Sequence, residues 1–148
     1  MWKMVIEAQR NIAACYKQLG REEDEINLEI KCHSWGMSLF GATHEKTLEY
    51  AVGVVTAMLR TGQHSRARSF CRAPMEALTN PNTEQAFKLR ACAAIAESLF
   101  DAAKGVALLE GVVRDARRVL GDEHESVKLF EGGLEDARAL ERSESCGY

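Results

Sequence analysis

The spacing of the apolar residues constrains the fold of this chain more than any other feature. Leu48, Ala51, Val52, Val55 and Met58 recur every three or four positions, which is the period of an amphipathic α-helix. Comparable stripes follow along the chain, and no useful stretch of the sequence alternates with the two-residue period of a β-strand. The sequence therefore predicts an all-α fold of about seven helices, over residues 2–19, 22–39, 44–61, 63–78, 83–100, 102–119 and 124–141.

Capping residues mark the starts of several predicted helices. Thr43 can cap the third helix by itself, because its hydroxyl can accept a hydrogen bond from a first-turn amide. Asn82 with Gln85, and Asp122 with Glu125, have the spacing of a capping box. These signals support the boundaries read from the apolar stripes.

Glycines and a proline predict where the helices end. Gly20, Gly41, Gly62 and Gly121 break the apolar period where the chain must reverse, since glycine tolerates a positive φ. Pro74 lies inside the fourth predicted helix, where it cannot donate to a preceding carbonyl and should kink or split the helix. Short turns at the glycines would place neighbouring helices antiparallel.

The chain also resembles itself. Gly20 and Gly62 are 42 positions apart, and residues 39–45 match residues 119–125 at a distance of 80 positions, about two periods. A period of roughly 35–45 residues made of two helices is typical of a solenoid.

Residues 40–48, Phe-Gly-Ala-Thr-His-Glu-Lys-Thr-Leu, resemble the opening Leu-Gly-x-x-His-x-x-Thr-Leu of kinesin light chain-type tetratricopeptide repeats. In the first unit, the sequence Asn11-Ile12-Ala13, followed by Tyr16 and then by Leu19 and Gly20, is similar to the family's Asn-Leu-Ala, Tyr and Leu-Gly positions. The resemblance implies an α-solenoid of about three and a half tetratricopeptide-like hairpins over residues 1–141. Residues 142–148 would then form a short polar C-terminal tail.

The match is not uniform along the chain. Ala67, five residues after Gly62, matches the small residue at which paired helices touch, but Glu25 occupies this position in the first unit. Ala103 stands where a third turn glycine is expected, and a final second helix is missing.

The resemblance also implies a function, because the first helices of successive hairpins line a concave groove that binds peptides. Aligning the units on Gly20, Gly62 and Ala103 assigns nine polar residues to this groove. They are Glu7, Arg10, Asn11, Lys17, Glu49, Thr56, Arg60, Arg90 and Glu97.

Among these nine, Asn11 matches the asparagine that hydrogen-bonds the main chain of a bound peptide in related repeats. The arginines and lysine suggest an extended ligand with some acidic character. Gly53 replaces the equivalent asparagine in the second unit, and solvated surface is the simpler interpretation of the charged residues. We expect a non-catalytic protein–protein interaction scaffold that binds a partner protein or peptide.

An alternative interpretation starts from the two ends of the array. Helix one begins at Trp2 without a preceding capping residue, and no helix follows the last apolar stripe. Exposed apolar ends would favour a structural subunit of a larger complex, docked through these ends and its convex face. The last stripe, which would be the docking face, is formed by Phe130, Leu134, Ala137 and Leu140.

Charge and hydropathy argue against two classes of partner. The chain has 19 basic and 22 acidic residues, interleaved along its 148 positions, whereas nucleic-acid binders concentrate basic charge on one face. The longest uncharged apolar stretch, Ala51 to Leu59, is about half of the roughly 20 residues that a membrane span requires. The first residues do not resemble a secretory signal. We expect no nucleic acid, no membrane insertion and a cytoplasmic location, with removal of an organelle signal left open.

Catalytic and metal-binding motifs are missing from the sequence. The five cysteines form no C-x-x-C pair, and those at positions 15, 71 and 92 fall in apolar helices, as buried thiols do. His44 and His124 occupy equivalent first-turn positions and are interpreted as structural, and no H-E-x-x-H occurs. Glu49 and Glu97 would need a pocket that raises one pKa to act as an acid–base pair. We therefore expect no enzyme, no cofactor and no metal.

Overall fold

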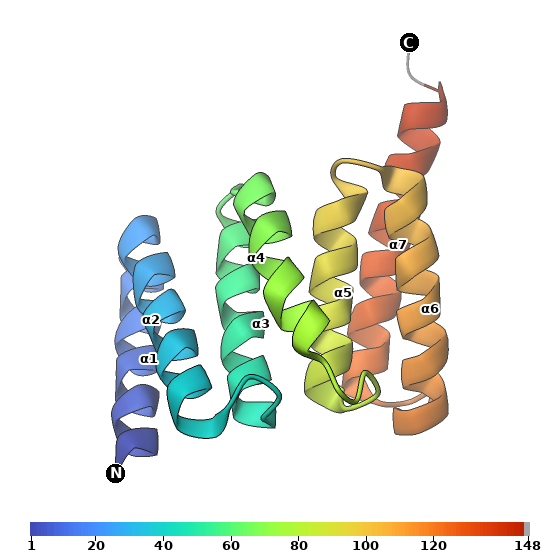
Figure 1. The fold of residues 1–148 in the computed structure, drawn as a ribbon. Coiled ribbons are helices and arrows are strands. Elements are labelled where there is room, and N and C mark those ends of the chain that lie inside the picture. Colours follow the sequence, from blue (N-terminus) through green and yellow to red (C-terminus); the bar gives the residue numbers. More distant parts are fainter. Residues whose placement is uncertain (147–148) are drawn as a thin grey trace. The chain divides into compact units, whose positions relative to one another are not determined.

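The computed structural model describes residues 1–146, with side chains described through residue 144. This part of the chain forms seven α-helices and no β-strand, which confirms the predicted all-α class (Figure 1). The helices are α1 (Trp2–Gln18), α2 (Glu22–Phe40), α3 (Glu45–Arg60), α4 (His64–Ala77), α5 (Glu84–Ser98), α6 (Ala102–Leu120) and α7 (Glu125–Cys146).

The last helix is longer than predicted, whereas α1 to α6 agree with the predicted boundaries within two residues. α7 continues to Cys146 instead of ending at 141, so most of the predicted tail over 142–148 is helical. No glycine or proline lies between Leu140 and Cys146 to end the helix sooner. Residues 147–148 of that tail lie outside the described residues.

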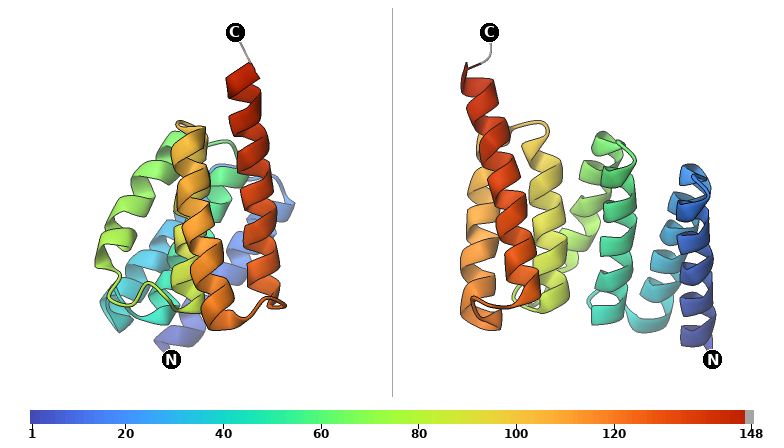
Figure 2. Two further views of the ribbon diagram at one scale, coloured as in Figure 1. Left: turned by 90° about the vertical axis from the view of Figure 1, so that its right-hand side faces the viewer. Right: turned by 180° about the vertical axis from the view of Figure 1, so that it is seen from behind.

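The chain divides into two compact units, Met1–Thr79 and Asn80–Tyr148. In the first unit, α2 packs against both α1 and α3, and α4 packs against α3. In the second unit, α6 packs against both α5 and α7, and α7 also contacts α5 (Figure 2). Within each unit consecutive helices run antiparallel, as expected from the short turns.

Two kinds of glycine turn each occur twice. Gly20 follows α1 with a φ of 74°, and Gly62 follows α3 with a φ of 79°. Gly41 follows α2 with a φ of 92°, and Gly121 follows α6 with a φ of 93°. An L-residue with a side chain rarely adopts these angles, so the structure confirms the four turn positions predicted from the sequence.

The prediction that Ala103 stands in the third turn is wrong. The turn between α5 and α6 is formed by Leu99, Phe100 and Asp101, and Ala103 lies inside α6. The Phe100 N–H donates to the Glu97 carbonyl at 3.0 Å, as the Gly62 N–H donates to the Leu59 carbonyl. Phe100 therefore takes the place of the glycine. The third sequence repeat should be aligned on Phe100, three residues before Ala103.

This corrected alignment identifies the small contact residue of the third hairpin. Gly105 follows Phe100 by five positions, as Ala67 follows Gly62. A Cβ atom at Gly105 would lie 2.3 Å from the Cβ of Ser98 and 2.5 Å from its Cα. α5 and α6 therefore approach so closely here that no side chain fits between them.

The residues that cap the helices differ from the predicted ones by one or two positions. The Nδ1 atoms of His44 and His124 each accept a hydrogen bond at 3.0 Å, from the Lys46 and Ser126 N–H respectively. At the start of α5, the Thr83 Oγ1 accepts from the Ala86 N–H at 3.1 Å. In each helix these residues cap instead of the predicted Thr43, Asp122 and Asn82, which lie too early to reach first-turn amides.

Pro74 does not split its helix. α4 is continuous from His64 to Ala77, and Pro74 is buried within it. The helix ends three residues later, and Leu78 is extended.

The apolar core of the second unit absorbs the predicted docking face. Phe130 is 3% exposed, Leu134 7% and Ala137 4%, and all three pack with residues of α5 and α6. Leu140 is half-buried. The prediction of an exposed stripe on helix seven is wrong, because α7 turns this stripe toward the hairpin that precedes it.

Candidate functional site

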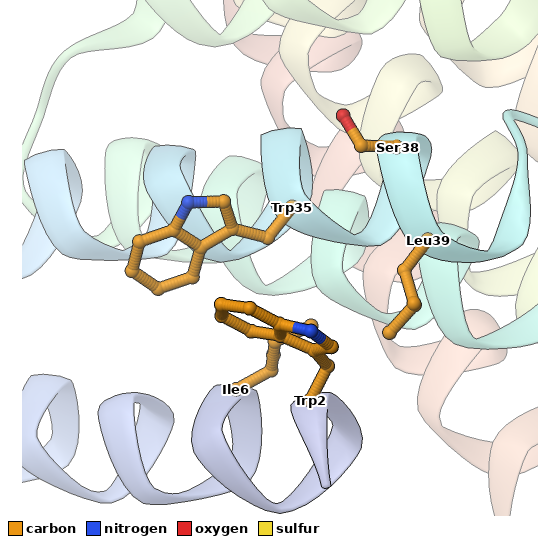
Figure 3. A pocket seen from close by; sticks show the side chains of 5 residues that line it. All are labelled: Trp2, Ile6, Trp35, Ser38 and Leu39. Atoms are coloured by element: carbon orange, nitrogen blue, oxygen red, sulfur yellow. The ribbon is translucent and has the colours of Figure 1, made fainter.

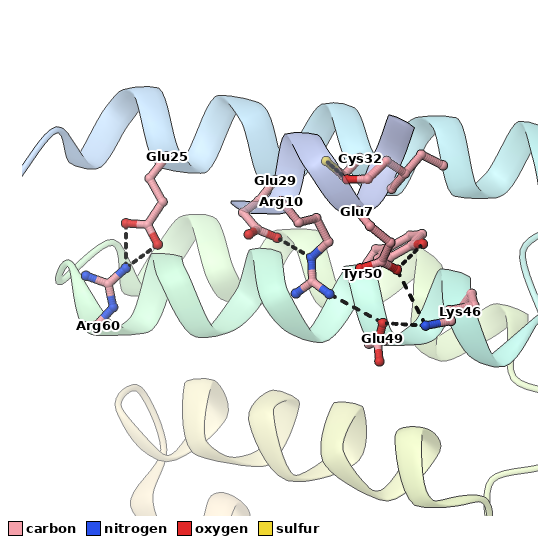
Figure 4. Close-up of polar contacts among 10 residues, drawn as sticks. Glu7, Arg10, Glu25, Glu29, Cys32, Lys46, Glu49, Tyr50 and Arg60 are labelled. Carbon is pink, nitrogen blue, oxygen red and sulfur yellow. Dashed lines mark hydrogen bonds and ion pairs between the residues drawn. The ribbon is translucent and has the colours of Figure 1, made fainter. Parts of the chain in front are cut away.

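The predicted groove residues lie on the first helix of each hairpin. Seven of the nine are in the first unit, on α1 and α3, and the other two are on α5 in the second unit. In the first unit, side chains of α1 and α3 interact directly, with α2 packed against both helices (Figure 4). The face formed by α1 and α3 is called the polar face below.

Glu7 on α1 and Glu49 on α3 share Lys46, and both take part in contacts that join the two helices. The Lys46 Nζ lies 3.5 Å from the Glu7 Oε1 and 3.4 Å from the Glu49 Oε2. The Tyr50 hydroxyl donates to the Glu7 Oε1 at 3.3 Å, and the Arg10 Nη1 donates to the Glu49 Oε2 at 3.4 Å. Neither Lys46 nor Tyr50 was predicted, because Glu7, the partner of both, is distant in sequence and comes close to them only when the helices pack.

Arg10 also faces a buried carboxylate on α2. Its Nε lies 3.6 Å from the Glu29 Oε2, and neither atom has a hydrogen-bond partner among the described residues. The Arg10 guanidinium lies 5.3 Å from the centroid of the Tyr50 ring, a cation–π geometry. Burial raises the pKa of the Glu29 carboxyl above its ordinary value, although Arg10 opposes the shift.

Gly53 makes room for this ion pair. A Cβ atom at this position of α3 would lie 2.6 Å from the Glu29 Oε2 and 2.9 Å from the Arg10 Nη2. In the sequence, Gly53 stands where the first repeat has Asn11. In the structure, the absence of a side chain lets charged groups of α1 and α2 reach the surface of α3.

Arg60, the other predicted arginine of this face, is engaged by Glu25. The Arg60 Nη2 donates to both carboxylate oxygens of Glu25, at 2.6 and 2.5 Å. Glu25 is 5% exposed and occupies the position where the repeat expects a small residue. A charged residue is tolerated there because Arg60 neutralises it.

The two predicted residues of the second unit are also paired. The Arg90 Nη2 donates to the Asp115 Oδ2 of α6 at 2.9 Å, and its Nη1 donates to the Pro81 carbonyl at 2.9 Å. The Arg90 hydrogen bond holds the pKa of the Asp115 carboxyl below its ordinary value. Glu97 lies 3.7 Å from the Lys104 Nζ.

Two of the nine predicted groove residues, Asn11 and Lys17, have exposed side chains and no polar partner among the described residues. Asn11 lies one helical turn after Glu7, so both occupy the same side of α1. Thr56 is exposed on α3. The structure thus divides the predicted set into paired charges that connect helices and a few polar groups that solvent can reach.

The described cysteines differ in exposure from the prediction. Cys71 is buried as predicted, Cys92 is half-buried, and Cys15 is exposed, so the prediction of a buried thiol at position 15 is wrong. Cys32 is 0% exposed, and burial raises the pKa of its thiol to about 11, far from the range in which a thiolate acts as a nucleophile. The side chain of the fifth cysteine, at 146, lies outside the described residues.

Among residues 1–146, no group of three or more His, Cys, Asp or Glu side chains could hold a metal ion. No described helix combines the length and the apolar character that crossing a membrane would demand.

No protein-family model matches the sequence, and no curated protein matches it.

Proposed function

We propose that this chain is a non-catalytic protein-binding module, built from tetratricopeptide-like hairpins, and that its polar face binds an extended segment of a partner protein. The observation that carries the proposal is the position of Asn11, whose exposed amide stands beside a fixed network of charged groups on α1 and α3. A side-chain amide offers both a donor and an acceptor, as a peptide backbone does.

The repeated turns support the hairpin repeat. Gly20 and Gly62 have nearly equal φ angles 42 positions apart, and Gly41 and Gly121 have nearly equal angles 80 positions apart. His44 and His124 cap the helices that follow the second pair, with the same atom and the same distance. Equal backbone angles and equal caps at the repeated positions are what a duplicated hairpin predicts.

The ion pairs make the polar face a preformed surface. Side chains already held in one conformation lose less entropy when a ligand binds. However, Arg10 and Arg60 are neutralised by glutamates of the same unit, so they no longer argue for an acidic ligand. Of the predicted basic groove residues, Lys17 alone has no ion-pair partner among the described residues, and the ligand at this face is held chiefly through its backbone.

A second candidate function is a structural subunit of a larger assembly. The observation that favours it is exposed apolar surface on the first hairpin, where Trp2 is 63% exposed, Met4 76% and Trp35 39%. The buried stripe of α7 no longer supports docking through the other end.

Affinity purification of the native protein and of an Asn11→Ala, Lys17→Glu double variant, read by mass spectrometry, tests the proposal. We expect the variant to lose the partner while its helical circular dichroism stays native, since both side chains are exposed. A matched control is the Ser65→Ala, Arg72→Glu variant, which changes exposed residues of α4. Equal recovery of the partner by all three proteins would exclude the polar face.

A further inference from the structure

A second surface on the first hairpin shares no residue with the polar face. Side chains of α1 and α2 line an open hollow of about 260 Å³ (Figure 3). Two indoles, from Trp2 and Trp35, lie between the helices, and Ile6 beneath them is 1% exposed. The full lining is Trp2, Ile6, Trp35, Ser38 and Leu39, and it is called the tryptophan groove below.

The size of the groove selects a small occupant. Pockets for cofactors and drug-sized ligands measure roughly 300–1,000 Å³, so 260 Å³ accommodates a single large side chain. Trp2 is 63% exposed and Leu39 43%, and apolar surface of this kind is stabilised when a partner covers it. Tryptophan is also among the residues that contribute most to binding when they become buried in an interface.

Hydrogen bonding and charge select the chemistry of that occupant. The indole N–H groups of Trp2 and Trp35 have no acceptor among the described residues, and none of the five lining residues is a carboxylate. Lys31 lies one helical turn before Trp35, on the same side of α2. This lysine is exposed and has no ion-pair partner in the described part of the chain. The groove therefore offers donors and positive charge around an apolar centre.

We propose that the tryptophan groove binds an acidic segment of a partner protein through one aromatic side chain flanked by Asp or Glu. The aromatic ring packs against the two indoles, where offset and edge-to-face contacts are favourable. The flanking carboxylates accept hydrogen bonds from the indole N–H groups and interact with Lys31. The polar face plays no part in this inference, which stands independently of the function proposed above.

A quaternary ammonium group is the competing occupant, because indole faces also attract cations. The neighbouring Lys31 opposes it, since like charges repel across a groove that has no carboxylate to compensate. The two occupants differ in the sign of their charge, and a binding experiment separates them.

The chain itself provides the reporter. Trp2 and Trp35 are its two tryptophans, so intrinsic tryptophan fluorescence reports on this groove alone. The probe is the synthetic peptide acetyl-Asp-Glu-Phe-Glu-Asp-amide, titrated into the full chain. Control probes are the same peptide with Ala in place of Phe, the peptide with Lys in place of the four acidic residues, and tetramethylammonium.

We expect a saturable change in emission with the acidic Phe peptide, and none with the three control probes at the same concentrations. Trp2→Ala should weaken binding roughly tenfold, as loss of an aromatic anchor does, with Trp35 remaining as the reporter. Lys31→Glu should weaken binding severalfold and reduce its salt dependence. Leu129→Ala, which removes a 69% exposed side chain of α7, is the matched control and should bind as the native chain does.

Three results would overturn the proposal. One is the absence of any saturable response to the acidic Phe peptide. Another is equal binding of the basic peptide or of tetramethylammonium, which would assign the groove to cations. The third is unchanged affinity in the Trp2→Ala variant, provided that its circular dichroism confirms a native fold.

Discussion

At the scale of single residues, the burial of Glu29 beside Arg10 makes the stability of the first unit depend on pH. Glu29 is 7% exposed, and the pKa of its carboxyl is raised because burial disfavours the charged form. Its partner Arg10 lies 3.6 Å away without a hydrogen bond between the two facing atoms. A charge buried with incomplete compensation costs free energy in the folded state.

The Glu29→Gln variant tests this cost through its pH dependence. A raised pKa means that the folded chain holds the proton more tightly than the unfolded chain does. The stability that protonation contributes is fully present below the ordinary value of 4.5 and is lost as the pH rises through the folded pKa. The variant lacks this loss, so its free energy of unfolding should rise relative to that of the native chain as the pH increases from about 4 to about 7.

Urea unfolding of both proteins across this range provides the measurement. Carboxyl groups that do not interact with Glu29 titrate alike in both chains and cancel in the difference. A difference that stays constant with pH, or that falls as the pH rises, would contradict the assignment.

Thiol labelling tests the environments of two cysteines. Cys15 is exposed, whereas Cys32 is 0% exposed and the pKa of its thiol is raised to about 11. In the folded protein at neutral pH, iodoacetamide should modify Cys15 and leave Cys32 largely unmodified, because the thiolate is the reactive form. Peptide mass spectrometry of native and urea-unfolded samples measures both sites. Equal modification of the two in the folded state would show that Cys32 is accessible.

At the scale of helices, histidine caps stabilise the N-termini of α3 and α7. His44→Ala and His124→Ala should each destabilise their unit by about 1 kcal/mol, the usual effect of losing an N-cap side chain. Thr43→Ala should change stability little, since Thr43 makes no cap in the structure. Thermal unfolding measures these differences. A larger loss of stability in Thr43→Ala than in His44→Ala would indicate that Thr43 is the cap, as expected from the sequence.

Two glycines of the second unit form a matched pair. A Cβ at Gly105 would overlap Ser98, including its backbone, whereas a Cβ at Gly132 would meet no described atom within 4 Å. Gly105→Ala should destabilise the protein by about 1–3 kcal/mol, as overpacking does. Gly132→Ala, also inside a helix, should stabilise it by about 0.5–1 kcal/mol. Chemical unfolding of both variants gives the comparison, and equal effects would mean that α5 and α6 are not in close contact.

Local signals explain which elements the sequence predicts well. Apolar periodicity and glycine position depend on neighbouring residues, and the helices and the turns at Gly20 and Gly62 were predicted correctly. The third turn was misplaced because Phe100 takes the glycine's place without a positive φ. α7 was predicted too short because its final residues are polar but still compatible with a helix.

The candidate sites were harder to predict because their partners are distant in sequence. Asn11 and Lys17 are exposed, as expected of groove residues. Arg60 is paired with Glu25, 35 positions away, and nothing local in the sequence indicates that pairing. Trp2 and Trp35 form one groove only after α1 and α2 pair, so neither residue was assigned to a binding site.

At the scale of the whole molecule, we propose that the hairpins serve as a surface for another protein. The first unit supplies a polar face on α1 and α3 and, separately, the tryptophan groove on α1 and α2. The second unit has the same glycine turn, at Gly121, and the same histidine cap, at His124. It buries the apolar stripe of α7 that was predicted to be a docking face. Partner binding is thus assigned to the first hairpins of the chain.

Site-specific photo-crosslinking reports directly which surface of the chain touches a partner protein. A photoreactive amino acid is placed at position 11 on α1, and at position 72 on α4 as a control, and each protein is irradiated in extracts of its own cells. If the polar face binds a partner, a protein is crosslinked at position 11 and not at position 72, and the crosslink is lost when Lys17→Glu is added. Crosslinks that are equal at the two positions, or absent at position 11, would contradict binding at the polar face.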